Sequence, residues 1–243
     1  ISEISIKNQG QFIPKPIVIE DILGRKQKVN DPKLLEDIEG KIILVTGAGG
    51  SIGSELCRQI HTLKPKLLIL LEQNEYNLFK ISSQLKENIL PSLTDIKDFS
   101  KMEEILRKFK PDYIFHTAAL KHITFVETDP IEALHTNFLA TVKLCQLCEF
   151  LKIKKMVFIS TDKAVNPSNM MGASKRLCEK YIQNIASKGK NTLFTIVRFG
   201  NVLGSTGSVV PVFERQISEG GPVKITHPKI RRFFMTIREA VEL

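Results

Sequence analysis

Long apolar runs are missing from this sequence. The longest, Leu67–Leu71, is only as long as a β-strand. A membrane-spanning helix needs about 18 or more apolar residues, so no segment of this chain is predicted to cross a bilayer. With 243 residues, 42% of them hydrophobic, the chain is nonetheless long enough to bury one large core. No signal-peptide pattern is visible.

Cysteine is also scarce, and the four present are Cys57, Cys145, Cys148 and Cys178. The spacing of Cys145 and Cys148 resembles half of a zinc site or a redox pair. A zinc site needs two further ligands of similar spacing, and the sequence offers none. We therefore predict no metal site, and thiols that are reduced and packed in a helix, as in a reducing cytosol.

Stacking aromatic residues do not interleave with the short basic clusters, such as Lys152, Lys154 and Lys155. The net charge of +9 would suit an acidic partner: nucleic acid, a membrane surface or a phosphorylated ligand. Without stacking aromatics the charge does not favour nucleic acid, and a solvated basic surface explains it as well.

From Lys41 onward, apolar runs alternate with helical patterns, beginning with the strand-like run Ile42–Val45. This alternation predicts an α/β fold, a Rossmann-type doubly wound parallel sheet with right-handed crossovers. We expect residues 1–40 to form an extended lead-in with a short helix near Ile19–Leu23. Residues 41–200 would form the nucleotide-binding domain. Residues 201–243 would begin a small C-terminal substrate-binding portion that is only partly included. The expected strands are 42–45, 67–71, 89–93, 113–116, 155–160 and 193–197, and the expected helices are 51–61, 74–86, 99–109, 131–151, 171–186 and 237–243.

A glycine-rich segment, 46–53, connects the first strand to the first helix. Gly47 suits a tight turn, Gly50 lets the pyrophosphate approach bare backbone, and Gly53 lets helix and strand pack closely. The helix N-terminus adds free N–H groups and a positive dipole. Because the strand–glycine–helix context is the required one, the segment predicts dinucleotide binding. The expected cofactor-binding residues are Gly47, Gly49, Gly50, Ser51, Ile52, Gly53, Glu72, Asp95, Ile96, Ala118, Ala119 and Lys175.

Glu72 ends the second strand, where a carboxylate accepts hydrogen bonds from the adenosine ribose and repels a 2′-phosphate. It therefore predicts NAD rather than NADP as the cofactor, unless Glu72 is only an exposed loop carboxylate. Asp95, after the third strand, could contact the adenine amino group.

Several motifs together resemble a known family. Gly47, Gly50 and Gly53, the Ser160–Thr161 strand end and Lys175 are similar to the extended short-chain dehydrogenases/reductases. The longer motifs resemble, more narrowly, the polysaccharide-biosynthesis and protein-glycosylation UDP-N-acetylglucosamine 4,6-dehydratases. These motifs are 49–56, 118–122, 160–164, 198–205, 207–211 and 232–236.

Met171 stands where the superfamily has a catalytic tyrosine, four residues before Lys175. A thioether cannot act as acid or base. However, the long, membrane-anchored branch of the resembled family has methionine there. The resemblance therefore implies a parent protein anchored in a bacterial inner membrane through a region outside this chain, with this domain on the cytoplasmic side. It also implies that the protein assembles into a homo-oligomer.

The resemblance implies an enzyme that oxidises C4 of UDP-N-acetylglucosamine, eliminates water and reduces C6, with bound NAD. Asp162 is the candidate acid at the C6 hydroxyl and Lys163 the candidate base at C5, although the pair could be a surface ion pair. Lys175 would contact the nicotinamide ribose. Thr161 or an ordered water would take the C4 proton. The branch implies retention at C5, giving UDP-2-acetamido-2,6-dideoxy-α-D-xylo-hexos-4-ulose.

Five residues are candidates for substrate binding. Lys121 and His122 follow the fourth strand, at the edge where open α/β sheets bind ligands. Asn201 and Arg232 match substrate-contacting positions of the resembled family, and an arginine fork suits a pyrophosphate. Asn137 could order a water or the backbone of the site.

Two alternatives remain. An inverting 4,6-dehydratase or a UDP-sugar epimerase would use the same scaffold. A non-catalytic NAD-binding regulator would explain the missing tyrosine, but it would have no use for an acid–base pair.

Overall fold

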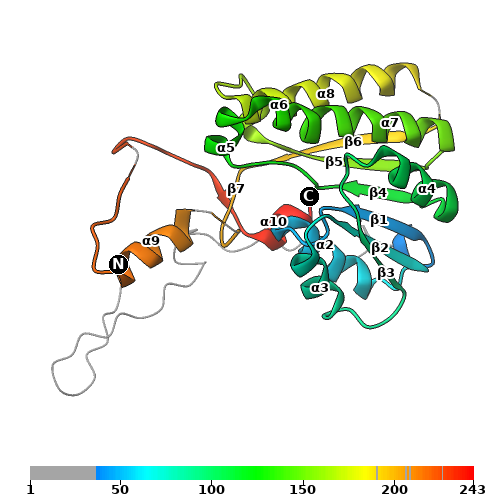
Figure 1. Ribbon diagram of the computed structural model, residues 1–243, viewed down its shortest axis with the longest axis horizontal. Helices are drawn as coiled ribbons and strands as arrows, with labels where there is room; N and C mark the ends of the chain where they lie inside the picture. The colour runs from blue at the N-terminus through cyan, green and yellow to red at the C-terminus, as the bar shows by residue number, and fades with distance from the viewer. Residues whose placement is uncertain (1–36, 190, 206, 208, 226) are drawn as a thin grey trace.

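The computed structural model describes residues 37–189, 191–205, 207, 209–225 and 227–243. Its centre is a six-stranded parallel sheet with helices on both faces (Figure 1). The strands are β1 (Ile42–Thr46), β2 (Leu67–Glu72), β3 (Ile89–Leu93), β4 (Tyr113–His116), β5 (Lys155–Thr161) and β6 (Leu193–Phe199). The predicted doubly wound fold is confirmed.

Along β1 and β2, successive side chains point alternately into two separate hydrophobic cores, one on each face of the sheet. Leu44 and Ile69 belong to the core under helices α4, α7 and α8. Ile43 and Val45, one position away, belong to the core under α2 and α3. Both faces of the central strands are covered, which explains why β1 and β2 read as continuous apolar runs. The helices are α2 (Ser51–Thr62), α3 (Glu75–Ser82), α4 (Phe99–Phe109), α5 (Ile123–Thr128), α6 (Pro130–Ala133), α7 (Ala140–Leu151), α8 (Met170–Lys188), α9 (Val209–Ser218) and α10 (Ile237–Val241).

The strand order is β3-β2-β1-β4-β5-β6, so the chain reverses its direction of winding between β1 and β4. Parallel pairing places the carboxyl ends of all six strands at one edge. Ligands of open α/β sheets bind at that edge, outside the switch point. The segments after β1, β2, β4 and β5 therefore determine the site.

The expected single α-helix over 131–151 is wrong in its middle. Residues Leu134–Leu139 form a π-helix between α6 and α7. Within this π-helix, the carbonyl of Asn137 accepts hydrogen bonds from two side chains, the Thr141 hydroxyl at 2.5 Å and the Cys178 thiol at 3.0 Å. Apolar periodicity cannot distinguish such a local widening from a regular helix.

Other elements were not expected from the sequence. These are α5, α9 and a second, two-stranded parallel sheet of β7 (Asn201–Val202) and β8 (Phe234–Met235). Helix α3 ends at Ser82, earlier than expected, where Ser82 and Ser83 donate to the carbonyls of Phe79 and Lys80. Helix α5, β7 and β8 have six or fewer residues, which is too few periods to be recognised in a sequence.

The four cysteines are free and buried, as expected. Cys145 and Cys148 both contact the sulfur of Met156, at 3.9 Å and 3.8 Å. No helix in the described part of the chain is long and apolar enough to span a bilayer. The expected short helix near Ile19–Leu23, and most of the lead-in, lie outside the described residues.

Candidate active site

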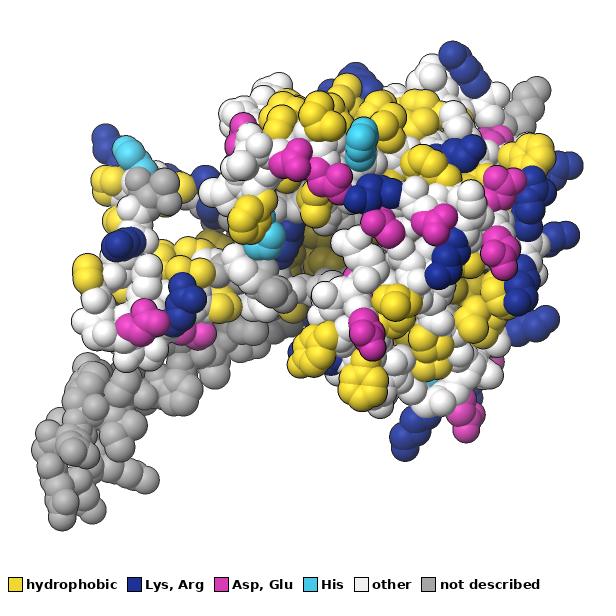
Figure 2. All heavy atoms as spheres, in the orientation of Figure 1, with side chains coloured by type: hydrophobic (Ala, Val, Ile, Leu, Met, Phe, Trp, Pro, Cys, Tyr) yellow, Lys and Arg dark blue, Asp and Glu magenta, His cyan; other side chains and the backbone are white. Residues whose placement is uncertain are grey.

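A cavity of about 640 Å³ opens at the carboxyl edge of the sheet, a size typical of ligand sites. Figure 2 shows the molecule hollowed here, between the sheet and the segment that carries α9. Most predicted site residues line it. Those that do are Gly47, Gly49, Gly50, Ser51, Ile52, Gly53, Glu72, Ile96, Ala118, Ala119, Lys121, His122, Thr161, Lys163, Met171, Lys175 and Asn201.

In the glycine loop after β1, backbone segments approach one another as closely as a dinucleotide-binding loop requires. Gly47 has φ +65°, and a Cβ there would lie 2.9 Å from the backbone of Ala118. A Cβ on Gly53 would lie 2.0 Å from the Gly47 carbonyl oxygen. The loop runs directly into the N-terminus of α2, and Ser51, Ile52 and Gly53 in the first turn of this helix line the cavity. These residues fit a pyrophosphate.

Glu72 lies beside this loop and is only 8% exposed as a residue. Its oxygens accept hydrogen bonds from the backbone N–H groups of Gly49 and Asn74, each at 3.0 Å. These bonds fix the carboxylate at the end of β2, where an adenosine ribose would be held. The interpretation of Glu72 as an exposed loop carboxylate is therefore wrong.

Asp95 is not among the residues that line the cavity. Its carboxylate accepts from the backbone N–H of Lys97 at 2.9 Å and lies 3.5 Å from the Lys97 Nζ. The neighbouring Thr94 and Ile96 do line the cavity. A contact of Asp95 with adenine stays a prediction, and in this structure the side chain is engaged by Lys97.

Lys175 on α8 is buried, so the interpretation as an exposed helix lysine is wrong. Its Nζ donates to the carbonyl of Ile159 at 2.8 Å and lies 4.4 Å from the centre of the Phe158 ring. Burial lowers its pKa from 10.5 to about 8, partly offset by Cys178 and Glu179. The amine is thus held at the end of β5, facing the cavity.

Asp162 and Lys163 form the turn after β5. The Lys163 Nζ donates to Asp162 Oδ1 at 3.0 Å, and the Thr161 hydroxyl donates to the same oxygen at 2.9 Å. Partial burial would raise the pKa of Asp162, but the hydrogen bonds from Lys163 and Thr161 outweigh it and lower the pKa. Lys163 and Thr161 line the cavity, whereas Asp162 does not. An acid role for Asp162 would need a proton that this environment disfavours.

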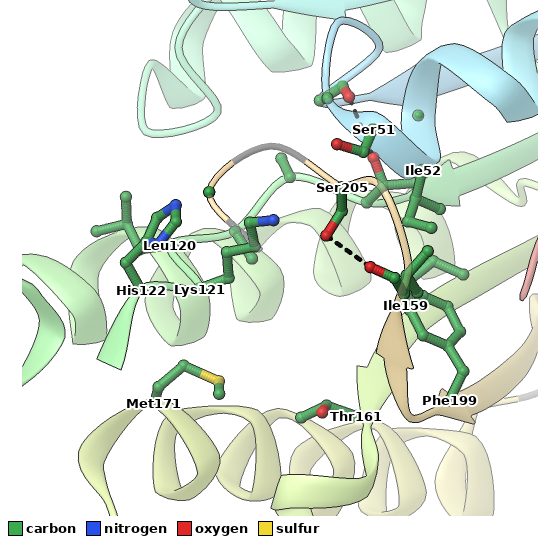
Figure 3. Close-up of a pocket in the computed structure, with 18 of the residues that line it drawn as sticks. Ser51, Ile52, Leu120, Lys121, His122, Ile159, Thr161, Met171, Phe199 and Ser205 are labelled. Atoms are coloured by element: carbon green, nitrogen blue, oxygen red, sulfur yellow. Dashed lines mark hydrogen bonds between the residues drawn. The ribbon is translucent and has the colours of Figure 1, made fainter. Parts of the chain in front are cut away.

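Met171 lies in the wall of the cavity, 5% exposed, in a small apolar cluster with Val126 and Ala133. Figure 3 shows its side chain and that of Thr161 reaching into the cavity from α8 and the end of β5, while Lys121 and His122 come from the loop after β4. Burial lowers the pKa of Lys121. At the position of the superfamily tyrosine, the cavity is therefore lined by the apolar side chain of Met171.

Two predicted substrate residues lie elsewhere. Asn137 is 1% exposed, and its amide bonds the backbone N–H and carbonyl of Leu120 and the hydroxyl of Ser174. It orders the loop that carries Lys121, which was the alternative role considered for it. Arg232 is exposed, does not line the cavity, and donates to the carbonyl of Arg231 at 2.8 Å.

Sequence reasoning missed a buried ionic network behind β5. The carboxylate of Glu179 has no exposed surface and accepts from the Ser160 hydroxyl at 2.6 Å, from Arg198 at 2.7 Å and from Arg176 at 3.0 Å. Burial would raise its pKa, but the hydrogen bonds from Arg198, Ser160 and Arg176 lower it to about 2. Its position one helical turn after Lys175 was the available signal.

His116, at the end of β4, was missed as well. Its ring nitrogens lie 2.7 Å from the Thr46 hydroxyl and 2.9 Å from that of Thr141. Complete burial, followed by the charge of Lys175, lowers its pKa to about 3, so the ring is neutral. It connects the start of the glycine loop to α7.

A glycine cradle, a ribose-side carboxylate and a lysine at the end of β5, all on a 3-2-1-4-5-6 sheet, define a Rossmann-type domain of the extended short-chain dehydrogenase/reductase class. Within that class, the chain belongs to the family described as polysaccharide biosynthesis protein, whose model matches residues 43–243.

Curated relatives agree with this assignment. The chain is 44% identical, over 236 residues, to the capsular polysaccharide biosynthesis protein CapD of Staphylococcus aureus, covering 94% of this chain and 39% of CapD. It is 34% identical to a UDP-N-acetylglucosamine 4,6-dehydratase (inverting) of Campylobacter jejuni, covering 84% of this chain and 62% of the relative. It is 33% identical to a UDP-glucose 4-epimerase of Rickettsia bellii, covering 84% and 61%. The chain thus spans only part of the length of each relative.

Solved structures share the fold. The structure of Pen from Bacillus thuringiensis has a TM-score of 0.80 and 36% identity, covering 84% of this chain and 64% of that one. The UDP-glucose 4-epimerase of Thermus thermophilus, solved with NAD, has a TM-score of 0.70 and 22% identity, covering 82% and 72%.

Proposed function

We propose that this protein is an NAD-dependent sugar-nucleotide 4,6-dehydratase that acts on UDP-N-acetylglucosamine. One observation carries the proposal: the Lys163 amine and the buried Lys175 line the same cavity as a dinucleotide-binding glycine loop, while Met171 replaces the tyrosine of the superfamily. A relative named as such a dehydratase supports the substrate.

The cofactor is NAD, which supplies the oxidation of C4 and the reduction of C6 and is regenerated in each turnover. Gly47, Gly50 and Gly53 would hold its pyrophosphate, and Glu72 its adenosine ribose. Lys175, whose amine donates to the carbonyl of Ile159, would bind the nicotinamide ribose. The structure of the Thermus thermophilus epimerase with NAD supports this choice at the level of the fold.

Proton transfers fall to the end of β5. The Lys163 amine takes the C5 proton, which is acidic once C4 is a ketone. The departing C6 hydroxyl needs a proton, and Asp162 can give it only if substrate binding raises the pKa of this carboxyl. Thr161, or a water held by it, takes the C4 proton, because the Met171 thioether cannot.

The stereochemistry at C5 separates two versions of the proposal. The predicted retention rests on the branch that Met171 resembles. The relatives whose names state a stereochemistry are inverting, so the inverting alternative is the better supported of the two. A UDP-sugar 4-epimerase remains the second candidate, because three Rickettsia relatives are named UDP-glucose 4-epimerase, at 33%, 33% and 34% identity.

Location and assembly are part of the proposal. We propose a parent protein held at a bacterial inner membrane by a region outside this chain, with this domain on the cytoplasmic side, and assembly into a homo-oligomer. Localisation of a tagged full-length protein in membrane fractions, and its mass by light scattering, test these two points. A purely soluble monomer would exclude both.

The test of activity is to incubate the protein with UDP-N-acetylglucosamine in deuterated water and follow the nucleotide sugar by NMR. A 4-keto, 6-methyl product that carries deuterium at C5 is expected, and its C5 coupling constant separates retention from inversion. Formation of the C4 epimer without loss of water would favour the epimerase. Unchanged substrate, with NAD shown to be bound, would favour a non-catalytic NAD-binding regulator.

A further inference from the structure

Asn201 was expected to contact the sugar nucleotide, but in this structure its side chain contacts Lys163. The Lys163 Nζ donates to Asn201 Oδ1 at 2.6 Å, a shorter distance than the 3.0 Å to Asp162 Oδ1. Both residues line the cavity, and the Lys163 side chain is 25% exposed. The Lys163 amine is therefore held by two oxygen acceptors that come from different parts of the fold.

The backbone of Asn201 is fixed independently of Lys163. Its N–H donates to the carbonyl of Phe233 at 3.0 Å, and Asn201 pairs with Phe234 in the β7–β8 sheet. The next pair, Val202 and Met235, packs in an apolar cluster that includes Ile52 of helix α2. The backbone position of Asn201 is thus determined by the β7–β8 sheet, which packs against helix α2.

The preceding Gly200 makes this approach possible. A Cβ at Gly200 would lie 2.8 Å from the carbonyl oxygen of Phe233, so a larger residue would push β7 away from β8. The chain leaves β6 at Phe199 and begins β7 at Asn201, with only this glycine between them.

The two acceptors have a chemical consequence. A neutral lysine amine has two N–H donors and one lone pair, and a lysine stem is otherwise free to adopt many rotamers. When Asp162 and Asn201 accept the two N–H bonds, only the lone pair is left for a proton. The Asp162 carboxylate, whose pKa is lowered, favours the ammonium form of Lys163, whereas the amide oxygen of Asn201 accepts its hydrogen bond without adding a second negative charge.

We propose that Asn201 is a positioning residue, which orients the Lys163 amine so that its lone pair is available for proton abstraction. This role rests on the proposed function of Lys163 as the C5 base. It makes the β7–β8 sheet part of the catalytic apparatus rather than only the start of a substrate-binding portion.

The first test measures the amine itself and needs no sugar substrate. The rate at which acetic anhydride labels Lys163, mapped by mass spectrometry across a pH series, reports how readily the amine loses its proton. In Asn201→Asp, the added carboxylate favours the ammonium form, so half-maximal labelling moves to higher pH. The exposed Lys180 serves as an internal control that does not move. The other titratable groups, which are Asp162 in contact with Lys163 and the cavity-lining Glu72, Lys121, His122 and Lys175, are the same in both proteins.

The second test uses the dehydratase reaction. Asn201→Ala should lower kcat about 10- to 100-fold with little change in KM, because a misplaced group loses transition-state stabilisation only. Asn201→Asp should keep the amine in place and move the rising limb of the kcat profile to higher pH.

Opposite results overturn the proposal. A rise in KM at unchanged kcat in Asn201→Ala would make Asn201 a substrate ligand. An unchanged labelling profile in Asn201→Asp would show that the contact does not control the amine, and it can be measured even if the alanine variant does not fold. If labelling moves as expected but no sugar nucleotide is dehydrated, the positioning holds and the proposed function fails.

Discussion

At the scale of single residues, Lys175 combines burial with charge. Its pKa of about 8 means that the amine is still mostly protonated at pH 7, where its side chain has little water around it. A buried cation of this kind lowers the stability of a protein unless its partners compensate fully. A ligand that uses the amine therefore explains its presence better than packing does.

Replacing Lys175 with methionine should raise the free energy of unfolding by about 1–2 kcal/mol at pH 7, because the buried charge is removed while the apolar stem stays. NAD affinity should fall about tenfold or more. Because the folded pKa of about 8 lies below the unfolded 10.5, the unfolded chain binds the proton more tightly between these values. The stability of the unchanged protein therefore rises across that window, and the advantage of the variant shrinks. Urea unfolding at pH 7 and pH 10 measures this, and a less stable variant at pH 7 would contradict it.

We expect Glu72 to determine the choice between the two nicotinamide cofactors. Replacing it with alanine removes the carboxylate that would hold the ribose hydroxyls and repel a 2′-phosphate. NAD should bind about tenfold more weakly, roughly 1.4 kcal/mol, and NADP more tightly than before. Calorimetric titration of both cofactors measures the change. Equal losses for the two cofactors would instead indicate that Glu72 only braces the N–H groups of Gly49 and Asn74.

At the scale of elements, the turn from β1 into α2 depends on closeness that only glycine allows. A Cβ on Gly53 would meet the Gly47 carbonyl oxygen at 2.0 Å, whereas one on Gly50 would lie 3.2 Å from the same oxygen. Gly53→Ala should cost about 1–3 kcal/mol of stability and abolish measurable NAD binding. Gly50→Ala, the matched control for stability, should change the melting temperature much less. Equal melting temperatures for the two variants would exclude the contact as the cause.

Helix α8 is joined to β5 and β6 by Glu179. Its carboxylate is fully buried, and replacement by alanine leaves Arg198 and Ser160 without their acceptor. We expect Glu179→Ala to lower the free energy of unfolding by about 2–4 kcal/mol at pH 7, since Arg198 is partly exposed and can be rehydrated. Glu179→Gln keeps one acceptor and should cost less.

The contribution of Glu179 also predicts a pH dependence. Its folded pKa is lowered from 4.5 to about 2, so its stabilisation is complete above pH 4.5 and is lost as the pH falls toward 2. The stability difference between the unchanged protein and Glu179→Gln should therefore narrow between pH 5 and pH 3 in urea unfolding. A constant difference would mean that the carboxylate charge does not contribute.

At the scale of the whole molecule, the cavity joins segments that are far apart in the chain. NAD should therefore stabilise the fold as a unit, by roughly 2.7 kcal/mol at a concentration 100 times Kd. Calorimetry with and without NAD should show one transition that moves to higher temperature. Gly53→Ala should show no shift, and two transitions of which only one moves would indicate that the parts unfold separately.

The features of the fold and the site that could be predicted are those that depend on residues close together in the sequence. The strands β1 to β6, the glycine loop and the positions of Glu72, Thr161, Lys163, Met171 and Lys175 were predicted, because each depends on a local pattern and on the shared edge of a parallel sheet. What the sequence did not show is which side chains make contacts across the fold. The amide of Asn137 bonds the backbone of Leu120, and Glu179 joins β5 to β6.

The sequence by itself determined the fold class, the dinucleotide cradle and the family, because hydrophobic periodicity, glycine spacing and short motifs are written along the chain. Only the tertiary structure decided which side chains meet. It brought the side chain of Asn201 to the Lys163 amine, left Arg232 outside the cavity and placed Asn137 in a π-helix. The physical reason is that a hydrogen bond tolerates only a few tenths of an ångström of variation in its donor–acceptor distance. Between residues that are distant in the sequence, that distance is set by packing and not by local propensity.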